Sequence, residues 1–297
     1  LEWMTGILLA AGALLLASAV VPHLGFVQRH LLSQSVVFRT WVVSLALSLA
    51  LYHTGLRRTW RVALATLAGG IVLSSFIHGY GWQSGWLPPL VALGAVVAVW
   101  IGRGLTRVAA WAALPGLVVM ATVVLPAVAR TERWSFDTRL LAWRGLAQMM
   151  EGRWIFGLGL AAYWHYWRDV IGYFAYLDPT TGYLHYTYDP QVNMHNNFVD
   201  VYGQAGVLGI AALLALLATL YIETRRQFVL EQTGFGRAYL AAAAAALSGM
   251  IFAAMLGDWI LPFVYNIGLK GFRDSFLGWL FLGGVLLLGR TRAPNAA

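Results

Sequence analysis

The sequence predicts an all-α membrane protein, a polytopic transmembrane helical bundle of about eight spans with one long loop region that contains short helices. The 297 residues are 60% hydrophobic and only 11% charged, whereas soluble domains are nearer 25% charged. The runs 6–21 and 207–221 contain no charged residue. A helix needs roughly 20 apolar residues to cross a bilayer, and in lipid its backbone groups must bond internally. These runs therefore favour membrane-spanning helices.

Eight apolar stretches define the predicted spans, at 4–21, 36–53, 59–77, 87–102, 107–129, 198–222, 237–260 and 270–289. Arginines gather in the connections after spans two, four, six and eight, at Arg57, Arg58, Arg61, Arg103, Arg107, Arg225, Arg226, Arg237, Arg290 and Arg292. If the spans alternate, all of them lie on one side, which the positive-inside rule makes cytoplasmic. The net charge of +8 then indicates topology and contact with membrane lipids, with no nucleic-acid partner.

The segment 130–197 separates the N-terminal transmembrane helices of 1–129 from the C-terminal transmembrane helices of 198–297. It is far longer than the other connections, and such loops are usually functional or disordered. Its many aromatic residues between 163 and 188 fit either stacking on sugars or an interfacial belt. Asp137 is expected to cap a helix that runs to about Met150. That helix places Arg139 and Trp143 one turn apart on the same face.

His195 lies where the long segment meets the sixth span. A neutral imidazole there could take a proton from a substrate hydroxyl, although a lone interfacial histidine is more often structural. Arg139, with Arg144 and Arg153 near it in sequence, could hold phosphate through its guanidinium or form a face that binds lipid headgroups. Trp143 joins this group as a binding candidate. No metal-ligand spacing is met, and no cofactor is implied.

Four glycines stand out beside these candidates. Gly157 and Gly159 predict a tight turn, because no nucleotide-binding context surrounds them. Gly206 and Gly209 lie one turn apart in the sixth span, where small residues let another helix or a lipid tail approach.

Taken together, these positions resemble a known family. His195-Asn196, nine residues, Gly206, two residues and Gly209 resemble the signature of the O-antigen ligases. The upstream pair Arg139 and Trp143, followed by the run 154–159 (Trp-Ile-Phe-Gly-Leu-Gly), is similar to a second pattern of that superfamily, which also includes O-antigen polymerases. The resemblance covers about residues 70–290.

The resemblance implies a bacterial inner-membrane enzyme whose active site faces the periplasm. Such enzymes transfer a glycan from an undecaprenyl-diphosphate carrier, with inversion and without metal or cofactor, to a sugar hydroxyl of the lipid A core. His195 would activate the acceptor hydroxyl and Arg139 would hold the diphosphate. Asn196, Trp143, Arg144 and Arg153 are the further candidates for substrate binding.

Two features depart from the family pattern. Members typically have about twelve spans, and a Ser-Arg-Gly motif of the family corresponds here to Trp82–Trp86, which lacks arginine. Arg144, Arg153 or His78 could replace that arginine. A polymerase of the same superfamily, whose acceptor is another carrier-linked glycan, stays open. So does a lipid or glycan transporter, although the span centres carry few charges.

Overall fold

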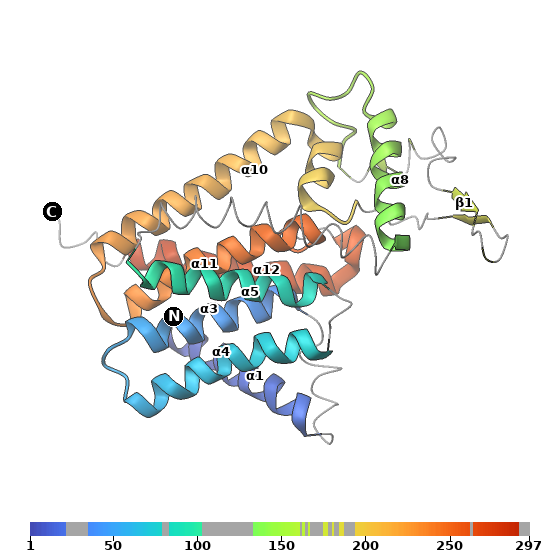
Figure 1. The fold of residues 1–297 in the computed structure, drawn as a ribbon. Helices are drawn as coiled ribbons and strands as arrows, with labels where there is room; N and C mark the ends of the chain where they lie inside the picture. The colour runs from blue at the N-terminus through green and yellow to red at the C-terminus, as the bar shows by residue number, and fades with distance from the viewer. Residues whose placement is uncertain are drawn as a thin grey trace. The chain divides into compact units, whose positions relative to one another are not determined.

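The computed structural model of the protein is mostly helical (Figure 1). It describes residues 1–21, 35–78, 83–102, 133–160, 162–163, 166, 175–177, 180, 184–186, 194–261 and 264–290. The helices of this part are α1 (Glu2–Val20), α3 (Val36–Tyr52), α4 (Arg58–His78), α5 (Gln83–Trp100), α8 (Arg133–Met149), α10 (Asn197–Leu230), α11 (Gly234–Leu256) and α12 (Val264–Arg290). Two short strands, β1 (Ala175–Leu177) and β2 (Leu184–Tyr186), pair antiparallel.

Seven of the eight predicted spans fall on helices, and the remaining one, 107–129, lies outside the described residues. Four helices of the described part are long and apolar enough to cross a membrane: α1, α4, α10 and α11. Shorter apolar stretches occur in α3, α5 and α12. Apolar helices of this length indicate a membrane protein.

The long segment differs from its prediction in two details. Helix α8 ends where expected but begins at Arg133, so Asp137 lies inside the helix and not at its N-terminal cap. The β1–β2 pair was not predicted, because each strand has only three residues, too few for a clear alternating pattern.

The chain divides into two compact units. Unit 1 comprises Leu1–Val118, Thr219–Ala253 and Asp274–Ala297, and unit 2 comprises Val119–Ala218 and Ala254–Arg273. The units cut across the predicted ranges 1–129, 130–197 and 198–297, since those ranges follow membrane topology and the units follow compactness. All the candidate residues from Arg139 to Gly209 belong to unit 2.

The core of unit 1 is built around α11. Its alanine run Ala241–Ala246 is buried throughout, as expected of small side chains that let helices approach closely. Trp41 of α3 is fully buried and packs against Phe281 of α12 with ring centroids 5.2 Å apart. Helix α3 also packs against α4 and α5, so it lies in the middle of this unit.

Unit 2 has a smaller core beneath α8. Its buried members are Ala142, Leu146, Met149, Met150, Leu158, Tyr163 and Met194. Residues of α8, of the turn that follows it and of the segment before α10 therefore share one apolar cluster. This cluster sets the position of Met194, which directly precedes His195.

Candidate functional site

Helix α8 separates its two candidate arginines. Arg139 is half-buried and Trp143, one turn later, packs against the unit 2 core, so the predicted shared face is confirmed. Arg144 is exposed and lies about 140° around the helix from Arg139, at 100° per residue. The structure therefore does not bring Arg144 next to Arg139, and its role in substrate binding stays a prediction.

Met194 is held from both sides. Its carbonyl accepts a hydrogen bond of 2.9 Å from the indole Nε1–H of Trp143, and its backbone N–H donates to Asp200 Oδ2 at 3.3 Å. The Met194 side chain is fully buried. These contacts fix the backbone immediately before His195 and give Trp143 a positioning role.

His195 adopts a positive φ of 49°, the only such value at a non-glycine residue in the described ranges. This conformation is uncommon for residues with a Cβ and often occurs at functional sites. The His195 side chain is exposed, yet neighbouring protein atoms still desolvate its ring. That desolvation, followed by the positive charge of Arg139, lowers the pKa of His195 to about 4. At neutral pH the imidazole is therefore uncharged, and Arg139 lies close enough to act on it.

Asn196 fixes the backbone on the other side of His195. Its Oδ1 accepts hydrogen bonds from the backbone N–H groups of Phe198 at 3.0 Å and Val199 at 3.2 Å, which is the geometry of a helix N-cap. Its Nδ2 donates to the Met255 carbonyl at 3.2 Å. These internal bonds give Asn196 a structural role, and its part in substrate binding stays a prediction.

The two sequence patterns that lie apart in the chain meet through their backbones. The N–H groups of Leu158 and Gly159 donate to the carbonyls of Gly203 and Gln204, both at 2.9 Å. In the opposite direction, Val207 and Leu208 of α10 donate to the carbonyls of Trp154 and Ile155 at 2.9 and 3.3 Å. We call this set of four bonds the 154–208 backbone pairing. It ties the turn after α8 to the first turns of α10.

Two glycines make this pairing possible. Gly206 has φ 63° and ψ −159° and kinks α10, and a Cβ at this position would collide with the Ile155 carbonyl. A Cβ on Gly157, whose φ is 75°, would lie 2.5 Å from the Ala205 nitrogen. Glycine reaches these conformations without the strain of a side chain. The turn predicted at Gly157 and Gly159 is confirmed, since Gly159 also has a positive φ of 99°.

The expected role of Gly206 and Gly209 in admitting another helix is corrected. Gly206 faces the backbone of the 154–155 turn. A Cβ on Gly209 would meet Ala205 and Val201 of α10 itself. The helical pattern of small residues could not reveal this, because the kink removes the regular spacing on which it depends.

Arg153 is engaged within unit 2. Its guanidinium donates to the Met149 carbonyl at 2.9 Å and lies over the Tyr166 ring at 4.5 Å from the centroid. Most of the other aromatic residues between 163 and 188 lie outside the described residues, so neither sugar stacking nor an interfacial belt can be assigned to them. Tyr163 is buried, and its hydroxyl donates to the Asp200 carbonyl at 3.0 Å.

Several polar residues behind His195 were missed as candidates. Asp200 and Asp258 are both buried, and their carboxyl groups lie close enough to hydrogen-bond to each other. Asn197, also buried, accepts the backbone N–H of Ile260 at 2.8 Å. Asp200 and Asp258 are ionisable residues near the ends of apolar runs, and this position is the signal that could have identified them. Only the folded chain shows that the two carboxyl groups lie next to each other.

The arrangement as a whole presents a neutral imidazole beside a fixed positive charge. Such a pair can accept a proton from a bound hydroxyl and stabilise an anionic group at the same place. No protein-family model matches the chain, and no curated protein matches it.

Proposed function

We propose that the protein is a membrane glycosyltransferase of the O-antigen ligase type. It transfers a glycan from an undecaprenyl-diphosphate carrier to a sugar hydroxyl, with the lipid A core as the acceptor. The observation that carries the proposal is the placement of Arg139 beside the neutral imidazole of His195. These residues come from near the two ends of the long segment, and each belongs to one of the two patterns that resemble the family.

In the proposed reaction His195 accepts the proton of the acceptor hydroxyl as its oxygen attacks the anomeric carbon. The bond from that carbon to the diphosphate oxygen breaks, and undecaprenyl diphosphate leaves with the electron pair. Arg139 offsets the charge that develops on this leaving group. Attack from the side opposite the diphosphate inverts the configuration. The bound diphosphate also brings negative charge toward His195, which raises its pKa and makes it a stronger base than in the empty site.

The proposal includes a topology of about eight spans in the bacterial inner membrane. The long segment then faces the periplasm and the arginine-rich connections face the cytoplasm. Its support is the distribution of arginine among the short connections, which follows the positive-inside rule. Cysteine-labelling of single-cysteine variants can test it directly, because the natural chain contains no cysteine.

The decisive experiment measures glycan transfer by the purified full chain in lipid nanodiscs that contain carrier-linked donor and lipid A core. We expect His195→Gln to lower the rate by about 10²–10⁴-fold and Arg139→Gln by about 10²–10³-fold. Arg226→Gln is the matched control, because Arg226 lies on α10 in unit 1 and its side chain is 74% exposed. Its rate should stay within about twofold of wild type, as is usual for exposed surface changes.

Full transfer by both His195→Gln and Arg139→Gln would overturn the proposed function. Incubation with the carrier-linked donor alone separates the acceptor classes. Growth of the glycan without lipid A core indicates a polymerase, whereas strict dependence on the lipid A core indicates a ligase.

A further inference from the structure

Unit 1 contains a hollow of about 510 Å³ at one end of the α3–α4 pair. Volumes of roughly 300–1,000 Å³ are typical of ligand sites. Two arginines, Arg58 and Arg61, contribute to the lining. The rest of the lining is apolar and consists of Ala50, Leu51, Leu56, Val62 and Ala65. The hollow therefore combines a cationic edge with a surface suited to hydrocarbon.

The two arginines are placed differently at this edge. The Nε–H of Arg61 donates to the Ala50 carbonyl at 2.6 Å, which fixes its guanidinium at the hollow while its terminal nitrogens stay available. Arg58 is exposed at the start of α4. Within the part of the chain that the structure describes, neither guanidinium pairs with a carboxylate. Together they offer the donors that suit a phosphate group.

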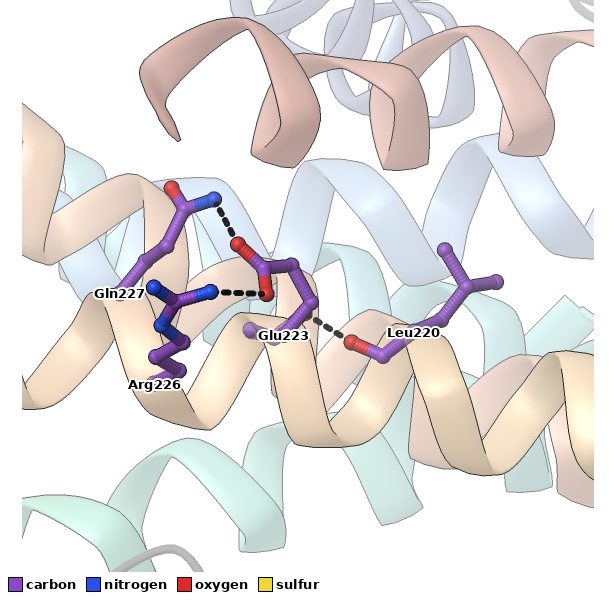
Figure 2. Close-up of polar contacts among 5 residues, drawn as sticks. Leu220, Glu223, Arg226 and Gln227 are labelled. Carbon is purple, nitrogen blue, oxygen red and sulfur yellow. Dashed lines mark hydrogen bonds and ion pairs between the residues drawn. The ribbon is translucent and has the colours of Figure 1, made fainter. Parts of the chain in front are cut away.

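No acidic residue lies close to these arginines in the sequence. Glu2 is the only acidic residue before Glu132, and Arg57 adds a third charge beside Arg58 and Arg61. Two other arginines of unit 1, Arg226 and Arg237, have partners within the chain. Figure 2 shows Arg226 and Gln227 turned toward the carboxylate of Glu223, with an Arg226–Glu223 distance of 3.7 Å.

Arg237 also has partners within the chain, and these are carbonyl groups and an aromatic ring instead of a carboxylate. It donates to the carbonyl groups of Phe228 and Glu231 near the end of α10 and lies over the Phe228 ring. Among the residues that the structure describes, the only acceptor of a hydrogen bond from Arg58 or Arg61 is the Ala50 carbonyl. An anion from outside the chain is therefore the natural partner of Arg58 and Arg61.

The position of the hollow identifies the source of that anion. Helix α4 is long and apolar enough to cross a membrane and begins at Arg58. If α4 spans the membrane, the hollow lies at the level where the helix leaves the hydrocarbon. Basic pockets at this level bind lipid headgroups. We propose that the hollow binds an anionic phospholipid, whose phosphate contacts Arg58 and Arg61 and whose acyl chain lies along the apolar lining. This inference does not depend on the proposed glycosyltransferase activity.

The test is native mass spectrometry of the full chain with phosphatidylglycerol and with phosphatidylcholine of identical acyl chains. We expect phosphatidylglycerol to bind more tightly. Arg58→Gln should weaken its binding by about fivefold, the effect of one basic residue near a membrane surface. Arg226→Gln removes the same charge elsewhere in unit 1 and should change binding by less than about twofold.

A second variant tests the apolar part. Ala65→Phe places a ring in the hollow and should weaken phosphatidylglycerol binding at least as much as Arg58→Gln, with an unchanged midpoint of thermal unfolding because Ala65 is exposed. Any of three results would overturn the proposal: equal binding of the two lipids, equal losses in Arg58→Gln and Arg226→Gln, or normal binding by Ala65→Phe. So would displacement of the lipid by glycerophosphoglycerol, the headgroup without acyl chains, at the same concentration as the intact lipid.

Discussion

The region around Arg139 in unit 2 and the hollow beside Arg58 and Arg61 in unit 1 use the same side chain in different settings. Next to Arg139, the backbone on both sides of His195 is fixed by a hydrogen bond that Trp143 donates to the Met194 carbonyl and one that Asn196 accepts from the Phe198 N–H. At the hollow, one side-chain bond from Arg61 to Ala50 fixes the arginine, and the rest of the edge is open. The proposed proton and leaving-group chemistry requires exact backbone placement, whereas the proposed lipid binding requires charge and volume.

The largest expected effect tests the backbone placement in unit 2. Gly206→Ala adds a Cβ where the Ile155 carbonyl lies and forces alanine into a conformation that is nearly restricted to glycine. We expect a loss of about 3 kcal/mol or more in the free energy of unfolding, together with loss of transfer. Tryptophan fluorescence during thermal unfolding measures the first effect. Gly69→Ala is the control, because a Cβ there meets no atom within 4 Å; equal midpoints in the two variants would contradict the pairing.

The next effect compares one helix cap in each unit. Asn196→Ala and Ser35→Ala each remove an N-cap, of α10 and of α3, and each should cost about 1 kcal/mol. Only Asn196→Ala should reduce glycan transfer, because only that cap positions His195. Hydrogen exchange at the amides of Phe198 and Phe38 reports the two caps. An equal loss of transfer in both variants would remove the distinction between the two regions.

A smaller effect is expected from Trp143→Phe. This change keeps an aromatic ring in the unit 2 core but removes the indole N–H that bonds to the Met194 carbonyl, at a cost of about 1 kcal/mol. The rate of glycan transfer should fall by more than the loss of folded protein accounts for, since the lost bond lies next to His195. Trp60→Phe in unit 1 changes an exposed ring and should alter neither quantity. Normal transfer by Trp143→Phe would show that Met194 needs no such anchor.

The smallest effect is electrostatic and concerns the pKa of His195. Arg139→Gln should raise this pKa from about 4, but not to the ordinary 6.5, because desolvation is the larger cause of the shift. Nitrogen NMR of histidine-labelled protein, assigned with His195→Gln, measures it. A pKa that stays the same or falls would mean that Arg139 does not act on the imidazole.

The same shift predicts how stability depends on pH. The unfolded chain protonates His195 below about 6.5, whereas the folded protein resists protonation down to about 4. The contribution of His195 to stability is therefore present above pH 6.5 and is lost as the pH falls through about 4. Denaturant unfolding of wild type and His195→Gln between pH 7 and pH 4 should show a smaller decline in the variant.

Much of the fold was predictable, because apolar runs and flanking arginines carry the signal for membrane helices. The sixth span shows what the sequence did not predict, namely where the helix ends. It was expected over 198–222, but α10 continues to Leu230, because the charged residues from Glu223 onward end the apolar run without ending the helix. The kink at Gly206 was not predicted, because it depends on carbonyl groups some fifty residues away in the sequence. For the same reason the supporting roles of Asp200 and Met194 required the folded chain.

The 154–208 backbone pairing constrains chain length more than it constrains side chains. Its four bonds join amide and carbonyl groups, which every residue but proline carries in full. Inserting a single residue between Trp154 and Gly159 would shift these partners out of register, whatever residue is added. Many substitutions at Ile155 or Phe156, whose side chains are exposed, would leave every partner in place. Homologous chains should therefore vary at Ile155 and Phe156 while keeping Gly157 and the number of residues between Trp154 and Gly159.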